Sequence, residues 1–411
     1  YKTKKEKKKM KRLLTKCLVA VLSAAMLIGC VSAFTGCGKS AKYKIGILLY
    51  NFTDIQGQEI SAYADYLEED FDVEFVKVSV GQDDDSHIQG LESCLNQGCN
   101  AVFSGYNTAI DTCVEMCEEA GVYYGLILGD TQTTELSEKT LTSKYYLGGV
   151  KQFSGDPSKV GKQFAELLNG SEYTEIAGLS FPPFAFIDGT TLWNAMVEDL
   201  GEGKQIKSAE NEAMPFPFNY KGDYFYFMFT ADACNAEVQK MFSKYPDIEV
   251  LVAMGSGMDY ILPALRQYNH TDVKMLCLGY NDDTMQYMQD GTLLAAGTNN
   301  YVQCMASMFA RAYDALESDG AAWYSDRPAA TAENYQYNGA DGAADYTIMT
   351  SVAEVEDFEN YIVCDDKGNG PITNEELKQC MLSFNEDATW AQLTELTTRT
   401  LGQIKAARTA A

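Results

Sequence analysis

Hydrophobic positions from Lys44 onward alternate between two patterns. Short runs of apolar and β-branched residues, typical of buried strands, lie at 44–50, 72–80, 100–105 and 122–129. Between these runs, apolar residues recur at helical spacing over 55–71, 85–98 and 108–121. Apolar strands that alternate with amphipathic helices predict a parallel sheet covered on both faces, and right-handed crossovers make such a sheet doubly wound.

The same alternation starts again after residue 143. Strands are expected at 144–150, 174–180, 248–254, 273–280 and 293–299. Helices are expected at 158–170, 188–201, 231–246, 258–269, 282–291 and 302–320, and the helix at 258–269 contains Pro263. Two such series in 411 residues predict an α/β protein of two similar doubly wound lobes.

Residues 321–411 do not follow this alternation. They contain the loop-like YNGADGAADY, a strand candidate in FENYIVCDD (358–366), and helix candidates around ITNEELKQCML and ATWAQLTELTTRTL. We interpret this region as an appendage that packs on the lobes and not as a third domain.

The N-terminal segment has the composition of a secretory signal. A basic stretch, KKEKKKMKRLLTK, precedes the uncharged CLVAVLSAAMLIGCVSAF, which predicts a signal peptide over 1–36. AFTGCGKS (33–40) loosely resembles a phosphate-binding P-loop, but Ala33 replaces the first glycine and the following segment is predicted as a strand. FTGC and LIGC resemble the bacterial lipobox instead. We expect lipidation at Cys37, with Cys30 as the alternative and cleavage without a lipid as a third possibility; residues 37–43 would form a tether.

The charge of the remaining chain argues against several partners. Removing residues 1–36 leaves 23 Lys and Arg against 57 Asp and Glu, a net charge of −34. Nucleic acid is bound through neutralisation of its phosphates by basic side chains, so no nucleic-acid partner is expected. The same charge repels anionic lipid, and no later apolar run is long enough to span a bilayer. We therefore expect an extracytoplasmic protein held to the membrane by its lipid.

Cysteine and histidine give no sign of a metal or cofactor. Nine cysteines follow Cys37, at 94, 99, 113, 117, 234, 277, 304, 364 and 380, without zinc-site spacing. Only His87 and His270 could supply imidazole ligands. Cys113 and Cys117 share one face of a predicted helix, where we expect them to pack and not to bridge. The redox state of the nine is left open by the sequence.

Residues suited to ligand binding gather where the predicted strands end. Ligands of open α/β sheets bind beyond the carboxyl ends of the strands. The candidates at or near these ends are Asn51, Phe52, Asp54, Tyr106, Asn107, Asp130, Phe184, Phe186, Trp193, Ser256, Asn281, Asp282 and Asn299. Aromatic rings can cover the C–H faces of a polyhydroxylated molecule while amides and carboxylates bind its hydroxyls. Helix capping is the alternative for the polar residues, and it does not explain the aromatic ones.

Catalytic patterns are scarce, which predicts a protein that is not an enzyme. The segment GSG (255–257) lacks the spacing of a nucleophile elbow, and a third histidine is missing. The acidic run DDD (83–85) lacks the spacing of a calcium loop, and we interpret it as a solvated surface. An extracellular hydrolase is therefore disfavoured.

Four segments in order resemble one known family. They are KIGILLYNFTD, LNQGCNAVFSG, EEAGVYYGLILGD and MLCLGYNDDTMQYMQDGTLLAAGTNN. From about Lys44 to Gly320 the chain is similar to the type I periplasmic-binding-protein family, in its ribose- and galactose-type sugar-binding members. The resemblance implies a monomer of two lobes, joined by hinge strands, that closes over a ligand and delivers it to an ABC importer permease.

The resemblance also implies domain bounds and residue roles. The N-terminal lobe would comprise 44–143 and 300–325, the C-terminal lobe 144–299, and the appendage 326–411. By motif position, the ligand residues would include Asn51, Phe52, Asp130, Asn281 and Asn299.

Departures from the family pattern change the expected ligand. No arginine occurs between Arg12 and Arg266, so bidentate clamps are missing and an anionic ligand is disfavoured. FPPFAF (181–186) replaces a small-residue loop, and Gly255-Ser256 stands where Asn-Asp is usual. A nucleoside or another small metabolite on the same fold, and a ligand sensor for a membrane histidine kinase, remain alternatives to a sugar carrier.

Overall fold

The computed structural model describes residues 41–81, 83–128, 136–150, 157–183, 186–211, 223–255, 257–320, 324–327, 345–364 and 370–409. The expected signal peptide and both lipidation candidates, Cys30 and Cys37, lie outside these residues. The description below concerns the unit that begins at Lys42.

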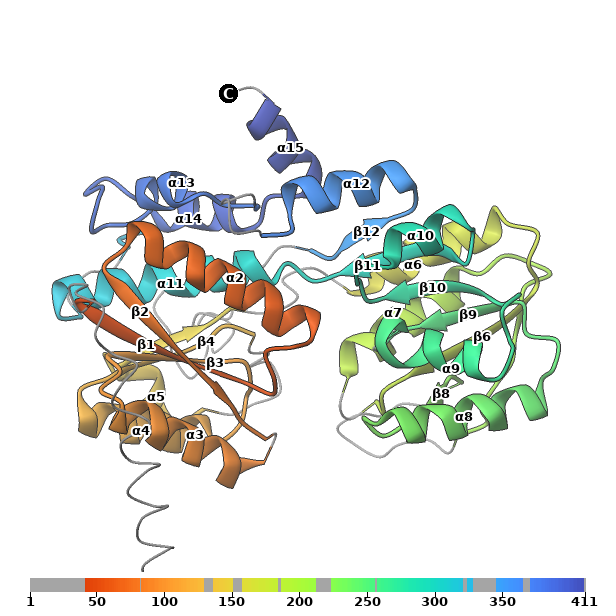
Figure 1. The fold of residues 1–411 in the computed structure, drawn as a ribbon, viewed down its shortest axis with the longest axis horizontal. Helices are drawn as coiled ribbons and strands as arrows, with labels where there is room; N and C mark the ends of the chain where they lie inside the picture. Colours follow the sequence, from red (N-terminus) through yellow and green to blue (C-terminus); the bar gives the residue numbers. More distant parts are fainter. Residues whose placement is uncertain are drawn as a thin grey trace, which may run out of the picture. The chain divides into compact units, whose positions relative to one another are not determined.

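The first sheet has five parallel strands in the order β2-β1-β3-β4-β5 (Figure 1). The strands are β1 (Tyr43–Leu49), β2 (Val73–Ser79), β3 (Ala101–Ser104), β4 (Tyr123–Leu126) and β5 (Tyr146–Gly149). One face packs on α2 (Ile55–Asp70) and α11 (Tyr301–Ser318), and the other on α3 (Asp84–Asn96) and α4 (Ile110–Ala120). A short helix, α5 (Glu138–Thr142), precedes β5.

The second sheet has the order β12-β11-β10-β9-β6-β7, with β8 also paired to β6. Its strands are β6 (Glu175–Ser180), β7 (Gln205–Ile206), β8 (Phe225–Tyr226), β9 (Val250–Ala253), β10 (Lys274–Leu278), β11 (Leu293–Thr298) and β12 (Thr347–Met349). All pairs are parallel except that of β11 with β12.

Helices cover both faces of the second sheet. Helices α6 (Pro157–Asn169) and α7 (Ile187–Asp199) form one core with it. The other core receives α8 (Ala231–Lys244), α9 (Leu262–Gln267), α10 (Thr284–Gln289) and α12 (Val352–Tyr361). A π-helical turn, η1 (Gly257–Ile261), connects β9 to α9.

Both sheets therefore repeat one topology, which confirms the predicted α/β class of doubly wound parallel sheets. In each sheet the chain adds a strand on one side of the starting strand and then moves to the other side. The strand order reverses between β1 and β3 in the first sheet, and between β6 and β9 in the second. Such switch points open a crevice at the carboxyl ends of the two strands, where ligands of this architecture bind.

The structure corrects three sequence-based assignments. The strand expected at 144–150 to open the second series is β5, which pairs with β4 in the first sheet. Residues 358–361 of the strand candidate FENYIVCDD continue α12, because Ser351 caps that helix and its apolar Val355 and Phe358 are buried at helical spacing. The helix expected at 258–269 begins as the π-helix η1, so Pro263 lies in the first turn of α9 instead of mid-helix.

The C-terminal region supplies side chains to the cores of both sheets. Its further helices are α13 (Asn374–Gln379), α14 (Trp390–Thr397) and α15 (Leu401–Thr409). Leu377 and Leu393 belong to the core of the first sheet, whereas Phe358 and Ile404 belong to a core of the second. The appendage is thus a structural part of both.

One buried carboxylate fastens this region to the first sheet. Asp314 of α11 accepts hydrogen bonds from the backbone of Leu382 and Ser383, at 2.9 and 2.8 Å, and from the Tyr324 hydroxyl at 2.9 Å. A buried charge is stable only when such donors surround it. The backbone of 382–383 is therefore fixed to α11.

Candidate ligand-binding site

The loop after β1 holds Asn51 and Asp54 in a tight local network. The Asn51 side-chain oxygen accepts hydrogen bonds from the backbone N–H groups of Thr53 and Asp54, both at 2.8 Å. Its amide nitrogen donates to the Asp54 carboxylate at 3.0 Å, and that carboxylate caps α2 by accepting from Gly57 N–H at 2.8 Å. A Cβ at Gly57 would collide with the backbone of Asn51 and Phe52, so the loop requires glycine there. Much of the polar capacity of this loop is therefore used to shape it.

Aromatic side chains lie beside that network. Phe52 is half-buried against the core of the first sheet, and Tyr50 is 58% exposed. After β3, Tyr106 is half-buried and meets the His87 ring edge-on, with centroids 6.2 Å apart. Asn107 follows at the same strand end and is half-buried. The predicted residues Asn51, Phe52, Asp54, Tyr106 and Asn107 thus all lie at the β1/β3 switch point.

The corresponding switch point of the second sheet is more aromatic. Phe181, which follows β6, lies 5.2 Å from Phe227 and 5.1 Å from Phe229, measured between ring centroids. Phe227 in turn meets Tyr260 edge-on at 6.1 Å. Phe229 has a positive φ of 28°, a conformation that costs a bulky residue free energy and is concentrated at functional sites. Met228, between them, is 50% exposed.

A carboxylate stands at the edge of this aromatic group. Asp259 and Tyr260 lie in η1, directly after β9, and π-helical turns are frequent at functional sites. Asp259 is exposed at its surface, yet partial desolvation by the surrounding protein raises the pKa of its carboxyl, and the negative charge of Asp54 raises it further. Desolvation likewise raises the pKa of Tyr260, with contributions from Tyr50, Asp259 and Asp54. The loops after β1 and β9 are therefore within electrostatic reach of each other.

Sequence reasoning missed Asp259 and Tyr260 because both fell inside a predicted helix. The available signal was the Gly255-Ser-Gly segment followed by Pro263, which interrupts regular helix at that point. In the structure a Cβ at Gly257 would collide with the Cys277 thiol, so the π-helical turn depends on glycine.

Buried acceptor atoms lie near the end of β11. Asn299 is 9% exposed and donates from its amide to the Tyr301 hydroxyl at 3.2 Å. Its side-chain oxygen accepts no hydrogen bond from the described residues. Glu59, in the second turn of α2, is 3% exposed, and neither carboxylate oxygen has a partner among the described residues. This burial raises the pKa of Glu59 to about 8.

Glu59 was not a candidate from the sequence. It occupies a helical position next to the apolar Ile60 and resembles the exposed glutamates of an amphipathic helix. Its negative charge contributes to raising the pKa values of Tyr301 and Tyr280, whose first cause is burial. Glu59 is therefore buried and within electrostatic reach of the segments that follow β10 and β11.

The other predicted residues have different positions. Asn281 accepts a hydrogen bond from Asp283 N–H at 3.0 Å and so serves as a local turn residue before α10, while Asp282 is exposed. Phe186 is half-buried at the start of α7, packed against Gly189. Three predicted residues, Asp130, Phe184 and Ser256, lie outside the described residues.

Trp193 belongs to the hydrophobic core. It is 1% exposed, covers Gly178 of β6 and meets Tyr224 edge-on at 5.9 Å. A Cβ at Gly178 would collide with the indole ring, so the close packing of Trp193 on β6 requires glycine at this position. We therefore leave Trp193 out of the proposed site.

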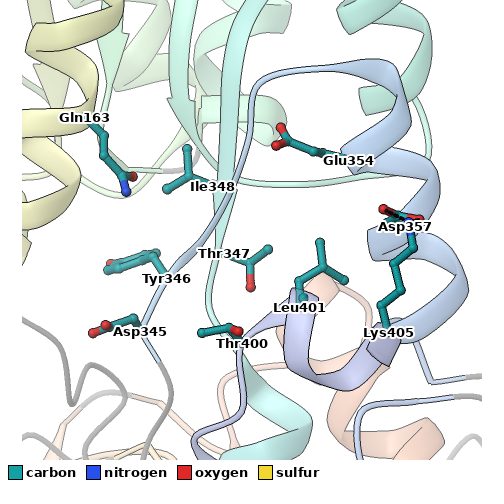
Figure 2. Close-up of a pocket in the computed structure, with 11 residues that line it drawn as sticks. Gln163, Asp345, Tyr346, Thr347, Ile348, Glu354, Asp357, Thr400, Leu401 and Lys405 are labelled. Carbon is teal, nitrogen blue, oxygen red and sulfur yellow. Dashed lines mark hydrogen bonds and ion pairs between the residues drawn. The ribbon is translucent and has the colours of Figure 1, made fainter. Parts of the chain in front are cut away.

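A cavity of about 370 Å³ lies elsewhere, between α6, β12, α12 and α15. Figure 2 shows its lining, with Lys405 of α15 reaching Asp357 of α12 at 2.6 Å. Glu354 accepts hydrogen bonds from the backbone and hydroxyl of Thr350 at 2.6 and 2.9 Å. Because Lys405 pairs with Asp357 and Thr350 donates to Glu354, these charged groups already have partners, and we assign the cavity to the packing of the appendage and not to the ligand.

The arrangement matches solved structures of solute-binding proteins. An ABC transporter solute-binding protein from Bacillus halodurans, with bound myo-inositol, matches with a TM-score of 0.53 and 13% identity, over 78% of this chain and 98% of that one. A periplasmic ribose ABC transporter protein from Conexibacter woesei matches with 0.52 and 14%, over 79% and 97%. A carbohydrate transporter solute-binding protein from Agrobacterium radiobacter, in complex with D-arabinose, matches with 0.53 and 14%, over 76% and 95%.

The chain has the type I periplasmic-binding-protein fold. No protein-family model matches the sequence, and no curated protein matches it. At 13–14% identity to these three structures, the likeness establishes the fold and leaves the ligand to be argued from the residues.

Within this periplasmic-binding-protein fold the described residues contain no cluster of three or more acidic, histidine or cysteine side chains placed to hold a metal. His87 is buried, with its Nε2 3.2 Å from the Tyr124 hydroxyl, and His270 stacks on Phe242. The nine cysteines after Cys37 form no disulfide with one another, and Cys113 and Cys117 pack in one core as expected. In the described part of the chain, no helix is both long and apolar enough to cross a bilayer.

Proposed function

We propose that the protein is an extracytoplasmic solute-binding protein that captures a small hydroxylated ligand of the sugar class for an ABC importer. The observation that carries the proposal is the chemistry of the two switch points. Aromatic side chains stand beside the Asn51–Asp54 pair at the first and beside Asp259 at the second, where ligands of doubly wound sheets bind. Rings that cover C–H faces and oxygens that accept from hydroxyls suit a sugar.

The proposed mechanism is closure of the two lobes over the ligand. A ligand that touches both switch points makes more contacts in the closed arrangement than in the open one, and therefore shifts the population towards closure. The permease would then recognise the closed form. Binding and release require no covalent step, so the proposed protein is not an enzyme.

Attachment to the membrane is the second part of the proposal. The lipobox-like FTGC and LIGC segments place the lipid at Cys37 or at Cys30. We expect Cys37→Ala to release the protein from membranes into the soluble fraction, as measured by cell fractionation. Release by Cys30→Ala alone would assign the lipid to the earlier segment, and release by neither would contradict the anchor.

A ligand screen tests the proposed function. The full chain, in detergent, would be melted with monosaccharides, disaccharides, polyols and nucleosides, because a ligand specific to the folded state raises Tm by mass action. A shift with one sugar class, confirmed by calorimetry, is the expected result. A larger shift with nucleosides would show that the ligand is a nucleoside and not a sugar. A well-folded protein whose Tm shifts with none of these compounds would contradict the proposal.

A further inference from the structure

Two cysteines stand at the C-terminal end of α3, in the core that this helix forms with the first sheet. Cys94 lies in the last turn of the helix, and Cys99 lies two residues before β3. Both side chains belong to the same buried cluster, and the exposed fractions of the two residues are 0% and 3%. Residues 96–98, which connect them, are exposed, so the pair lies beneath a surface turn.

The backbone at this helix end holds the two cysteines together. Cys99 N–H donates to the Cys94 carbonyl at 3.1 Å, and Gly98 N–H donates to the Leu95 carbonyl at 3.0 Å. Gly98 has a φ of 76°, in the left-handed region. These are the features of a Schellman motif, which brings the side chains of its first and last residues into contact across the turn. Cys94 and Cys99 occupy those two positions.

The two thiols are within hydrogen-bonding distance of each other. Their hydrogen bond lowers the pKa of the Cys99 thiol, and the same bond together with burial raises the pKa of the Cys94 thiol. A Cβ at Gly46 of β1 would collide with the Cys94 thiol, so the strand packs closely on its other side. A disulfide joins sulfur atoms that are about 2 Å apart, so the two enclosed thiols need only a small approach to bond.

A second pair of cysteines in the same core lacks this arrangement. Cys113 and Cys117 are four residues apart within α4, where side chains on one face point in the same direction along the helix. The Cys113 thiol is hydrogen-bonded to the Tyr124 hydroxyl. At the end of α4 a similar motif pairs Cys117 with Val122, whose N–H donates to the Cys117 carbonyl at 2.8 Å. This pair, also fully buried, is therefore an internal control for the first.

We propose that Cys94 and Cys99 form a reversible disulfide, a redox site that fastens the end of α3 to the start of β3. The oxidant is a small disulfide, R–S–S–R, which reaches the pair when the exposed turn at the helix end opens locally. The Cys99 thiolate attacks one sulfur of this molecule, and the first R–S⁻ leaves. The Cys94 thiolate then attacks the Cys99 sulfur, and the second R–S⁻ leaves. Each released thiolate takes up one of the two thiol protons, so the protein loses two electrons and two protons while R–S–S–R becomes two R–SH.

The redox site is separate from the proposed ligand site. The pair precedes β3 and so lies at the amino end of this strand, whereas the switch point lies at its carboxyl end. We therefore expect the disulfide to raise Tm and to leave ligand affinity unchanged. The proposed extracytoplasmic location would expose the pair to oxidants of this class.

Refolding in a glutathione buffer tests the redox site. The full chain, in detergent, would be reduced, unfolded in urea, freed of reductant and refolded in mixtures of reduced and oxidised glutathione. Alkylation of the denatured product and mass spectrometry would then locate the remaining thiols. We expect Cys94 and Cys99 to escape alkylation together and to appear as one linkage, while Cys113 and Cys117 are alkylated. Dithiothreitol should restore both thiols, and the bonded form should melt about 2–4 °C higher than the reduced form.

Two outcomes would contradict the proposal. Alkylation of both Cys94 and Cys99 at every glutathione ratio, or bonding of either to a different cysteine, would overturn the assignment of the disulfide. A bonded form whose Tm is no higher than that of the reduced form would overturn its fastening role. Neither outcome bears on the ligand screen, so failure here is distinguishable from failure of the proposed function.

Two variants locate the effect. In Cys99→Ala the remaining Cys94 should be alkylated under all conditions, and Tm should no longer depend on the glutathione ratio. Cys113→Ala removes a thiol of equal burial from the same core and should keep both the linkage and the difference in Tm. A Tm that still rises with oxidised glutathione in Cys99→Ala would overturn the proposal. Peptide mapping of the wild type decides the assignment even where a variant fails to fold.

Discussion

The two switch points have the same topology but different chemistry. At the first, Asn51 and Asp54 use short hydrogen bonds to fix their own loop. At the second, Phe229 adopts a strained backbone and Asp259 stands in a π-helical turn. Each switch point contains one non-glycine residue of positive φ, Ala109 at the first and Phe229 at the second, but only at the second does that residue belong to an exposed group of aromatic rings. The first is shaped mainly by hydrogen bonds within its own loop, so the second switch point is expected to carry more of the ligand's specificity.

The largest effect is expected at Glu59, because α2 buries this carboxyl and neither of its oxygens has a partner among the described residues. Burial raises its pKa to about 8 in the folded protein, against 4.5 for an ordinary glutamate. Between these values the folded state binds one proton more than the unfolded state, so the free energy of unfolding falls as pH rises. The full loss would be about 4–5 kcal/mol.

Urea unfolding at pH 5, 6, 7 and 8 measures this loss. In Glu59→Gln the side chain stays neutral, so the variant should become more stable than the wild type towards pH 8. The tyrosines that sense Glu59, Tyr280 and Tyr301, stay neutral over this range because burial raises their pKa values. Glu92→Gln, an exposed charge removal on α3, serves as the matched control and should follow the wild type. A wild-type stability that stays flat from pH 5 to 8 would show that Glu59 is charged and solvated.

Variants of two aromatic residues distinguish a structural role in the hydrophobic core from a role in ligand binding. Trp193→Ala removes a buried indole and should lower the free energy of unfolding by about 3–5 kcal/mol. Tyr260→Ala removes a half-buried ring at the second switch point and should weaken ligand binding about tenfold, with a much smaller effect on stability. Urea unfolding and calorimetry on both variants give the two quantities. The opposite pattern would reverse the roles that we assign to them.

The smallest effect is expected at Asn51. Asn51→Ala removes four hydrogen bonds of the loop, of which the exposed ones contribute little, so stability should fall by about 1 kcal/mol. Affinity should fall through a faster dissociation rate, because the loop is no longer held in its bound shape. Stopped-flow fluorescence with the ligand from the screen measures the rate. A loss of affinity as large as that of Tyr260→Ala would mean that Asn51 touches the ligand.

Much of the fold could be predicted because its signals are local. Strands such as 44–50 and helices such as 55–71 have uninterrupted periodicity, and the structure has them as β1 and α2 within a residue. The position of β5 could not be predicted, because strand pairing with β4 is a long-range choice that periodicity does not encode. The short strands β7 and β8 have two residues each and carry no periodicity at all.

The positions of several candidate residues could be predicted, whereas their role in binding stays a prediction. Strand ends are visible in the sequence, so Asn51, Phe52, Asp54 and Asn299 could be placed at such ends before the structure was known. Asp259 was hidden because a π-helical turn has no sequence period of its own, and Glu59 because burial of a carboxyl depends on what packs over it. Trp193 was misplaced for the same reason, since only the structure shows that Gly178 makes room for its ring.

The position of the C-terminal side chains has a consequence for the order of folding. Leu393 completes the core of a sheet whose first strand begins at Tyr43, and Ile404 completes a core of the other. Domains commonly fold as they leave the ribosome, N-terminal part first. These two cores therefore cannot be complete before Leu393 and Ile404 have been made, whereas the cores on the opposite faces of the two sheets contain no described residue after Ile348. We expect one face of each sheet to stay uncovered for most of synthesis, which would favour a chain that crosses a membrane in extended form.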